Sequence, residues 1–596
     1  MPEYLAPGVY VEETSFRAKS IEGVGTSTTA FVGPTRRGPV DGVPEMVTSL
    51  TDFEHIYGGL ENLVLADVND ARRRLNFVAH AVRAYFDNGG SRLYVMRTVN
   101  GAATAAGRLR DGGSDAEAAF LRARFPGAAC NARVVFRESR RPATVRTLGT
   151  APAGSLVSVM VGNNETLYSG SGTTWADSGN TALSFTNLGP GDVPGGAGAT
   201  ANLVTLAVEV TDADGGTQSW EDLGVTRAHP RWIGNVLALN PGNRADALNN
   251  LVWADIGASV DAFELVAAVR ALPAVAGDSE GRRFLLLGSG DGSVAGTDGS
   301  APTLGAETTA GSYAAALAVL SGLEDVSIVA APGSSAYADA QAIQNALIAH
   351  AERRRAYRIA VLDCAPLQTP GDMRTARGRI DSRYAALYYP WVVVSNPLAR
   401  PGRDDIPREI TLPPSGFVSG IYARNDIQRG VYKAPANEVV TGALRFESDI
   451  NFAQQELLNP LGVNCLRYLS GRGYRVWGAR LVSSDPEWKY VSDRRYFNYL
   501  EASIDRGTQW AVFEPNGERL WANIRQTIAD FLYNEWRNGA LLGTTVEQAY
   551  FVRCDRSTMT QNDLDNGRLV CLIGVAIIKP AEFVIFRIGQ KTADAE

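Results

Sequence analysis

DVSIVAAPGSSAYADAQAIQNALIAHAERRRAYRIAVLDCAP (residues 325–366) has the pattern of a strand, a helix and a second strand. The first and last segments are short apolar runs that end in turn residues, which is typical of strands buried on both faces. The segment between them has a helical period. Its expected inward side consists of Ala340, Ile343, Ala346 and Leu347. A strand–helix–strand unit predicts a largely parallel sheet covered by helices.

The same pattern occurs on both sides of this stretch. TTAFVGPT, LNFVAHAVRAYFDNGG and SRLYVMRTV follow one another within residues 28–99 and predict another strand, helix and strand. LYYPWVVVSNP (387–397) is strand-like again. We therefore expect one α/β core domain built from residues 25–99 and 245–395.

Residues 100–244 interrupt that core with a different pattern. GSLVSVMVGNN (154–164) and NLVTLAVEVTDADGGTQSW (202–220) alternate apolar and polar residues between turn signals, which indicates strands joined by hairpins. DADGG (212–216) lacks the later glutamate of a calcium-binding EF-hand loop and is better explained as a hairpin turn. We interpret this region as a β-rich insertion.

Residues 396–580 are expected to form a second α/β domain. NGERLWANIRQTIADFLYNEWRNG (516–539) predicts a long helix capped by Asn516. The apolar stripe of that helix consists of Leu520, Ile524, Ile528, Leu532 and Trp536. LPPSGFVSGIYARNDIQRGVYKAPANE (412–438) is rich in Pro and Gly, so we expect a structured connection there and neither a helix nor a central strand. The fold class expected for the whole chain is a multidomain mixture of α/β and α+β.

Both ends of the chain are expected to be extended arms, over residues 1–24 and 581–596. The strand-like part of the first arm is Gly8, Val9, Tyr10, Val11, Glu12 and Glu13, and that of the second is Phe583, Val584, Ile585, Phe586, Arg587 and Ile588. Unpaired strand edges are a liability in a monomer, whereas a neighbouring subunit could pair with them as added strands. The strand expected to receive the arms is Leu569, Val570, Cys571, Leu572 and Ile573.

Composition argues against several functional classes. The net charge of −7 and the absence of a long basic run argue against nucleic-acid binding. The five cysteines are widely spaced, which favours reduced thiols, and the four histidines have no metal-ligand spacing. We therefore expect no metal and no cofactor. No apolar run of about 18 residues and no signal peptide are found, so we expect no membrane insertion and assembly in the bacterial or host cytoplasm.

Three short motifs are candidates for catalysis. GDSEG (277–281) matches the hydrolase pattern G-x-S-x-G, but a helix precedes Ser279 and a strand follows it, which is the reverse of the required order. The glycine-rich segment 288–300 lacks the G-K-[ST] of a phosphate loop and is expected to be a surface loop. Cys364 follows a strand, and His350 lies on the preceding helix, so a buried structural cysteine is the simpler interpretation. We predict no catalytic residue.

YYPWVVVSNP, the 412–438 stretch, LNPLGVNCLRYLSGRGYRVWGARLVSSDPEWKYVSDRR, FEPN, GALLG and PAEFVIFRIGQ occur in this order over roughly residues 380–590. Together they resemble the tail sheath protein of contractile bacteriophage tails and of phage-tail-like contractile injection systems. YLAPGVYVEE and FVGPTRRGP near the N-terminus and LEDVSIVAAPG in the middle support the resemblance. The insertion carries little of this signal.

The resemblance implies a subunit that stacks as hexameric rings around an inner tube of a different protein and contracts. Its partners would be copies of itself, the tube protein, and baseplate and terminator or cap proteins. The inserted domain would lie outside, and the C-terminal domain inside. The family motif of the inner domain would be Arg424, Asp426, Arg429, Lys433, Pro435, Asn437 and Glu438. The polar side of helix 518–537 would contact the tube through Arg519, Asn523, Gln526 and Asp530.

Two other functions stay open at this point. A static self-assembling shell or surface-layer protein would share the arms but would not switch between two packings. An α/β hydrolase would need Ser279 or Cys364 in a nucleophile–base pair. The sequence does not separate a phage from an injection system.

Overall fold

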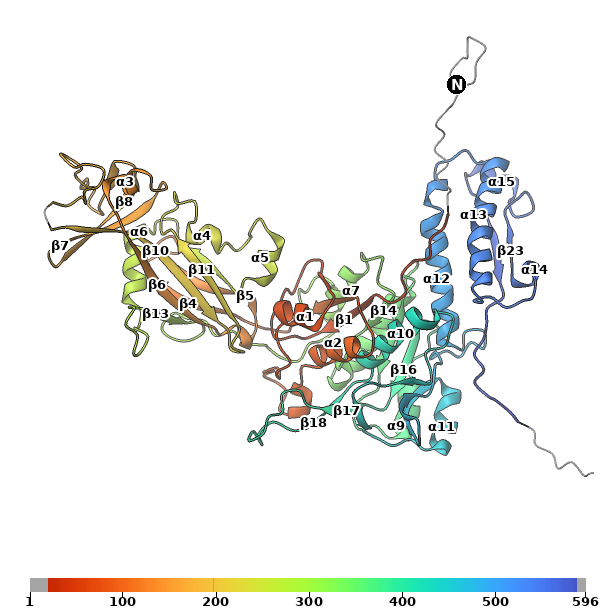
Figure 1. Cartoon of the computed structure of the whole chain (residues 1–596). Helices are drawn as coiled ribbons and strands as arrows, with labels where there is room; N and C mark the ends of the chain where they lie inside the picture. Colours follow the sequence, from red (N-terminus) through yellow and green to blue (C-terminus); the bar gives the residue numbers. More distant parts are fainter. Residues whose placement is uncertain (1–19, 197, 587–596) are drawn as a thin grey trace, which may run out of the picture.

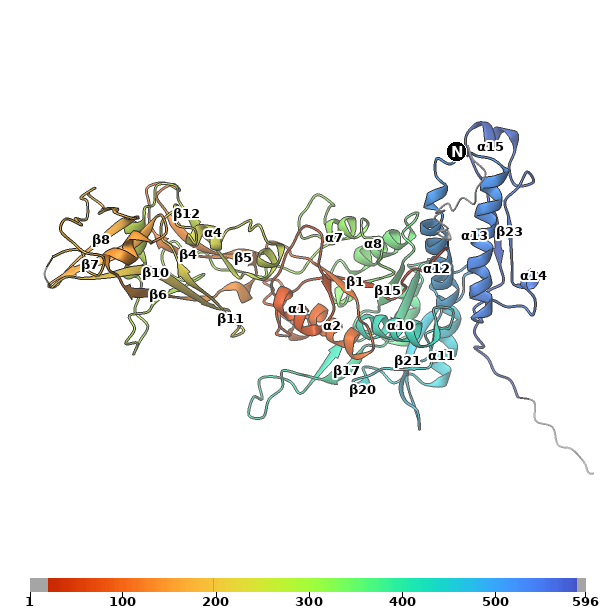
Figure 2. The same ribbon diagram turned by 45° about the horizontal axis from the view of Figure 1, so that its top comes forward.

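The structure, a computed structural model, describes residues 20–196 and 198–586. Three parts follow one another along an elongated molecule: a β-rich outer module, an α/β core and a C-terminal module of long helices and a hairpin (Figures 1 and 2). The outer module comprises residues 104–287, the core residues 28–99 and 301–482, and the C-terminal module residues 491–579. Within the described ranges, no helix is both long and apolar enough to cross a membrane.

The core is organised by a nine-stranded sheet in the order β19-β22-β21-β16-β15-β14-β1-β3-β2. Its strands are β1 (Thr29–Gly33), β2 (Met46–Val47), β3 (Leu93–Arg97), β14 (Ile328–Ala330), β15 (Ile359–Asp363), β16 (Ala385–Tyr389), β19 (Glu438–Val439), β21 (Val463–Leu469) and β22 (Gly473–Val476). The six strands from β21 to β3 in this order run parallel. The predicted strand–helix–strand unit of residues 325–366 is confirmed as β14, α8 and β15.

Helices cover this sheet, with α2 packed on α10 and α7 packed on α8. The core helices are α1 (Leu50–Tyr57), α2 (Phe77–Asp87), α7 (Tyr313–Leu320), α8 (Ala340–Glu352), α9 (Pro370–Arg377), α10 (Ser415–Arg429) and α11 (Phe452–Leu458). Ile343 and Leu347 of α8 are buried as predicted, whereas Ala340 and Ala346 are half-buried. A small sheet of β17 (Val392–Ser395), β18 (Glu409–Leu412) and β20 (Ala443–Phe446) lies beside the core sheet.

The core sheet crosses the domain boundary that we expected at residue 396. Strand β21 pairs in parallel with β16, and β22 and β19 extend the sheet further. After Pro390 the chain leaves the sheet as β17, but it returns about 70 residues later at Val463. The pairing partner of β16 is therefore remote in sequence, and a local change of pattern at residue 396 does not mark the end of the sheet.

The expectation of an irregular connection at residues 412–438 is wrong for its first half, because Ser415–Arg429 form helix α10. Asp363 holds the start of this helix, since its carboxylate accepts hydrogen bonds from the Ser415 backbone N–H and hydroxyl, both at 2.7 Å. The glycines do not break the helix but let it approach α2. A Cβ on Gly416 would lie 2.7 Å from the Ala81 Cα, and one on Gly420 would lie 2.4 Å from the Tyr85 carbonyl oxygen.

The outer module extends further along the chain than the expected insertion at 100–244. Its strands are β4 (Thr104–Arg110), β5 (Ala119–Pro126), β6 (Arg133–Pro142), β7 (Ser155–Val161), β8 (Asn164–Ser171), β9 (Thr174–Ala176), β10 (Thr200–Thr211), β11 (Thr217–Leu223), β12 (Val252–Ile256) and β13 (Arg283–Leu286). Its helices are α3 (Val145–Gly149), α4 (Ile233–Val236), α5 (Arg244–Asn249) and α6 (Ala262–Ala271). Because β12 pairs with β5 and β13 with β6, residues 245–287 belong to this module and not to the core.

The C-terminal module is built on two long helices, α12 (Val491–Gly507) and α13 (Glu518–Arg537). A two-stranded antiparallel sheet, β23 (Tyr550–Arg553) and β24 (Leu572–Val575), and the short helices α14 (Val546–Ala549) and α15 (Gln561–Asp565) complete it. The predicted stripe of α13 is confirmed as buried, with Trp536 half-buried. The predicted cap is wrong, because the helix begins at Glu518 and Gly517 is its N-cap. The Asn516 side-chain oxygen instead accepts a hydrogen bond from the Trp521 indole N–H at 2.7 Å.

Candidate assembly site

The C-terminal tail is tied to the core at Glu582. Its carboxylate accepts hydrogen bonds from Arg480 Nε at 2.7 Å and Nη2 at 2.6 Å, from Asn459 Nδ2 at 2.8 Å and from the Tyr490 hydroxyl at 2.9 Å. These donors, Arg480 foremost, lower the pKa of Glu582 to about 2, although burial acts in the opposite direction. No local sequence pattern indicates this anchor, because the partners of Glu582 lie about 90 to 120 residues earlier in the chain.

Beyond this anchor, four apolar side chains in a row lie in solvent. Phe583, Val584, Ile585 and Phe586 are 70%, 68%, 79% and 83% exposed, and they form no strand in the monomer. An exposed contiguous apolar segment marks an interaction site. These residues belong to the expected C-terminal arm. Arg587 and Ile588 of that arm, and Gly8, Val9, Tyr10, Val11, Glu12 and Glu13 of the N-terminal arm, lie outside the described residues.

The sheet expected to receive the arms has a free edge. Among residues 20–196 and 198–586, β24 pairs only with β23. Leu572 and Ile573 belong to β24, whereas Leu569, Val570 and Cys571 precede it. A groove of about 730 Å³ lies next to β24. Its apolar lining includes Phe497, Leu500 and Ile504 of α12, Leu532 of α13, and Ile573 and Val575 of β24.

The N-terminal segment is tied down close to the same module. Thr26 donates its hydroxyl to Asp426 Oδ2 at 2.6 Å, and Val24 N–H donates to the Ser503 hydroxyl of α12 at 3.1 Å. Arg495 of α12 binds Asp426 through two hydrogen bonds of 2.8 Å and 2.6 Å and also donates to the Thr26 carbonyl at 3.0 Å. The path of the chain from residue 20 to the core sheet is therefore fixed by the end of α10 and by α12.

The other residues of the expected family motif lie around the turn after α10. Lys433 Nζ lies 2.5 Å from Glu438 Oε1, and Arg424 donates to the Val439 carbonyl at 2.8 Å. Asn437 has a positive φ of 60°, and its side-chain oxygen accepts from Arg472 at 3.2 Å. The two remaining members are Pro435, which is buried, and Arg429, which is exposed at the C-terminal end of α10. These contacts lie within one subunit, so they give the motif a structural role here.

The polar side of α13 faces solvent. Arg519, Asn523, Gln526 and Asp530 are all exposed, and Gln526 Nε2 donates to Asp530 Oδ1 at 2.7 Å. Their spacing of three or four residues places them on one side of the helix, opposite the buried stripe. This side is therefore free for contact with another chain.

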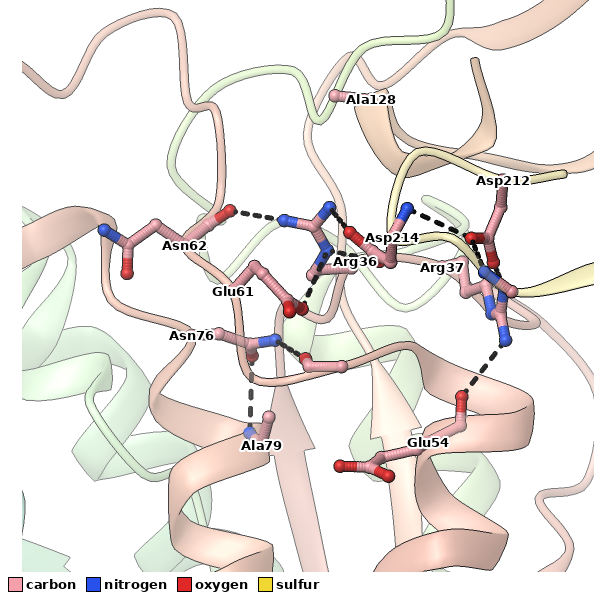
Figure 3. A network of polar contacts seen from close by, with 12 residues as sticks. Arg36, Arg37, Glu54, Glu61, Asn62, Asn76, Ala79, Ala128, Asp212 and Asp214 are labelled. Carbon is pink, nitrogen blue, oxygen red and sulfur yellow. Dashed lines mark hydrogen bonds and ion pairs between the residues drawn. The ribbon is translucent and has the colours of Figure 1, made fainter. Parts of the chain in front are cut away.

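A network of polar contacts connects the outer module to the core (Figure 3). Arg37 Nη1 lies 2.5 Å from Asp212 Oδ2, and Arg36 Nη2 lies 2.5 Å from Asp214 Oδ1. Asp212 and Asp214 belong to the DADGG turn, which is confirmed as the hairpin turn between β10 and β11. Asp298 adds a second contact, because its carboxylate accepts from the Ala128 and Val64 N–H groups, both at 2.7 Å.

Asp298 lies in the glycine-rich segment 288–300, which was expected as a surface loop. That segment runs beside residues 100–106 through three β-bridges and returns the chain from the outer module to the core. Gly296 lets this segment pass close to the backbone of the outer module, because a Cβ on Gly296 would lie 2.4 Å from the Gly127 carbonyl oxygen.

The residues weighed for catalysis are not arranged as nucleophile and base. Ser279 is exposed in a turn between α6 and β13, so it lacks the strand–turn–helix context of a hydrolase elbow. His350 Nε2 lies 2.6 Å from Arg358 Nη1, and burial lowers the pKa of His350 to about 3. Cys364 is buried, and its burial raises the pKa of the thiol. In the described part of the chain, no cluster of His, Cys, Asp and Glu could hold a metal ion.

Two family models match adjacent stretches of the chain. Residues 306–480 match the phage tail sheath protein central domain, and residues 483–591 match the phage tail sheath C-terminal domain. These stretches correspond to the second part of the core and to the C-terminal module with its tail. The outer module lies outside both matches, in agreement with its weak signal in the sequence.

Two curated relatives are tail sheath proteins. The putative prophage major tail sheath protein of Pseudomonas aeruginosa (strain UCBPP-PA14) is 25% identical over 267 residues, which cover 44% of this chain and 64% of the relative. The tail sheath protein of Enterobacteria phage T4 is 24% identical over 177 residues, which cover 29% of this chain and 26% of the relative. The chain thus spans less than two thirds of the length of each.

Solved structures resemble the fold over almost the whole chain. The contracted PVC sheath complex of an extracellular contractile injection system has a TM-score of 0.52, with 18% identity and 99% of each chain covered. The contracted helical sheath of the anti-feeding prophage (AFP) has a TM-score of 0.51, with 20% identity and coverage of 99% of this chain and 100% of the other. At these identities the likeness concerns the fold.

Proposed function

Since the chain belongs to the phage tail sheath family, we propose that it is a structural subunit of a contractile sheath. In this proposal it polymerises as stacked hexameric rings around an inner tube and contracts to drive that tube through a target envelope. The subunit is part of a phage tail or of a contractile injection particle and assembles in the cytoplasm. It acts without enzymatic chemistry of its own, because the switch between two packings releases energy stored in the interfaces at assembly.

The observation that carries this proposal is the combination of an exposed apolar tail and an unpartnered strand edge in one subunit. Residues 583–586 lie in solvent, and within the part of the chain that the structure describes β24 is paired along one edge only, beside a groove with a partly apolar lining. Strand addition would satisfy both, because the main-chain groups of the tail would pair with β24 and its alternate side chains would enter the groove. A tail given to one neighbour and an edge offered to another produce a head-to-tail assembly.

The anchors explain how arms could link subunits and still allow contraction. Glu582 fixes the start of the C-terminal arm, and the Thr26–Asp426–Arg495 contacts fix the end of the N-terminal segment. Each arm would therefore leave the subunit from a defined point and act as a tether between subunits that move as rigid bodies. Strand pairing at its far end would survive a rigid-body rotation of the subunits.

The polar side of α13 is our proposed contact with the inner tube. Arg519, Asn523, Gln526 and Asp530 are exposed on a long helix of the C-terminal module, the part that would face the tube. Baseplate and terminator or cap proteins are the further partners that we propose for the two ends of such a sheath. A tube protein with a complementary mixed-charge surface would fit this side.

Two truncations test the exchange of arms, one lacking residues 1–14 and one ending at Glu582. Each is co-expressed with the tube protein of its own gene cluster and inspected by electron microscopy. We expect folded monomers with unchanged thermal unfolding and no long tubes. The matched control is Phe513→Ser, which removes an exposed aromatic residue elsewhere and should assemble normally. Normal tubes from both truncated chains would contradict the arm model.

A trigger experiment separates the contractile sheath from a static shell. Assembled wild-type particles are treated with mild acid or guanidinium and compared with untreated particles. Tubes that shorten, thicken and expose a thinner inner tube support contraction. Tubes of one fixed length in all conditions would favour the static shell.

A further inference from the structure

Two cysteines of the C-terminal module face each other at the end of its two-stranded sheet. The ladder pairs Arg553 with Leu572, and Cys554 and Cys571 are the next residues in the same antiparallel register. The two thiols lie close enough for each to influence the pKa of the other. Both are free thiols, Cys554 buried and Cys571 half-buried. The pair lies between the loop carrying α15 and the strand whose edge is open.

The spacing of opposite residues in an antiparallel pair suits a disulfide. Facing Cα atoms lie about 4.5–5.5 Å apart, and a disulfide needs roughly 4.4–6.8 Å. Positions that face each other in such a pair therefore have a Cα spacing within the range that a disulfide needs. The other cysteines have no such relation, because strand β16 lies between Cys364 and Cys465, and Cys130 lies in the outer module.

We propose that Cys554 and Cys571 form a thiol–disulfide pair that a small-molecule disulfide oxidises. The thiolate of half-buried Cys571 attacks one sulfur of an oxidised glutathione molecule, so that a mixed disulfide forms and one glutathione thiol leaves. The Cys554 thiolate then attacks the Cys571 sulfur and releases the second glutathione. Both cysteine protons end on the two glutathione thiols, the protein is oxidised by two electrons, and the oxidant is reduced by two.

The surroundings of the two thiols determine how fast they oxidise and what the disulfide would do to the sheet. Burial raises the pKa of both thiols, and the positive charge of Arg525 on α13 acts against that rise. The reduced pair is therefore stable at neutral pH in a reducing cytoplasm and oxidises slowly outside it. The bond would close the loop of residues 555–570 and hold β23 and β24 in register. It would fix the sheet just where an added strand would pair, and it does not depend on that addition.

The test is a disulfide map of the intact full-length protein. It is incubated with oxidised glutathione, alkylated in denaturant and digested with trypsin without reduction. We expect alkylatable cysteines to fall from five to three, out of the five in the chain. Peptide 554–556 should be recovered linked to peptide 569–587 and should separate from it on reduction. A parallel sample without oxidant should keep all five thiols.

The variants Cys571→Ser and Cys130→Ala distinguish a specific pair from general oxidation. Cys571→Ser should lose the linked peptide and keep four alkylatable thiols, whereas Cys130→Ala should still form the link and keep two. A stable glutathione adduct on Cys571 with a free Cys554 would overturn the proposal. So would an oxidised sample that keeps all five thiols, or one that links Cys554 to any other cysteine.

Discussion

Arg495 donates two hydrogen bonds to Asp426, from Nη1 to Oδ1 at 2.8 Å and from Nη2 to Oδ2 at 2.6 Å. Both side chains are almost fully buried, with exposed fractions of 3% for Arg495 and 5% for Asp426. The guanidinium also lies 4.7 Å from the centre of the Tyr422 ring. Because α12 and α10 contribute one residue each, the pair joins the C-terminal module to the core. The Thr26 contacts bring the N-terminal segment into the same network.

Asp426→Ala is expected to be strongly destabilising. It leaves the Arg495 charge buried without its partner, which typically costs about 3–5 kcal/mol of unfolding free energy. Urea unfolding measures the change. The matched control is Asp405→Ala, because Asp405 pairs with Arg403 in solvent, at 62% and 60% exposure, and should lose under about 1 kcal/mol. Equal losses of unfolding free energy in the two variants would show that the buried pair stabilises the fold no more than the exposed pair does.

Gly416→Ala is expected to separate α10 from α2. The new Cβ would lie 2.7 Å from the Ala81 Cα and 2.9 Å from its carbonyl oxygen, and backbone atoms cannot give way cheaply. We expect a loss of about 1–3 kcal/mol in unfolding free energy, as for other overpacked sites. Gly371→Ala in exposed α9 is the control, and it should be neutral or stabilising by roughly 0.5–1 kcal/mol. A neutral Gly416→Ala would mean that the glycine is not needed for helix packing.

Sequence patterns identify the elements of this protein better than their partners. β14 and β15 could be predicted because strands buried on both faces of a parallel sheet are almost wholly apolar, with Asp363 at the end of β15 as the exception. Helix α10 was missed because its glycines have poor helix propensity, and the close approach to α2 that they permit is a tertiary contact. The membership of β21 in the core sheet depends on pairing with β16 about 75 residues away, which no local pattern contains.

The candidate site divides in the same way. The apolar character of residues 583–586 can be read from the sequence itself, and the structure shows that these side chains are exposed, whereas their role as an arm stays a prediction. Glu582 could not, because a single carboxylate gives no sign that Arg480, Asn459 and Tyr490 converge on it. The Asp212 turn was correctly predicted as a hairpin, but its contact with Arg37 joins residues 175 positions apart.

Asp212→Ala combined with Asp214→Ala should loosen the outer module. The two substitutions remove the charged partners of Arg37 and Arg36, and charge-assisted hydrogen bonds contribute about 1.5–3 kcal/mol each when they are shielded from water. We expect faster hydrogen exchange in the β10–β11 turn and in residues 36–38, with little change in the core sheet. Asp222→Ala is the control, because its pair with Arg141 is exposed within the same module. Unchanged hydrogen exchange at residues 36–38 would show that the two aspartates do not hold the outer module to the core.

Glu582→Gln should remove a pH-dependent part of the stability. The folded-state pKa of Glu582 is lowered from 4.5 to about 2, so its carboxylate stabilises the folded chain above the unfolded-state pKa. That contribution is lost as the pH falls from about 4.5 through about 2, because the carboxylate must then be protonated in both states. At pH 7 the variant should be less stable than the wild type in urea, and the difference should shrink steadily below pH 4.5. Glu307→Gln, whose pair with Arg353 is exposed, should differ little from the wild type at any pH. A Glu582→Gln difference that stays constant down to pH 2 would show that the anchor acts through packing and not through its charge.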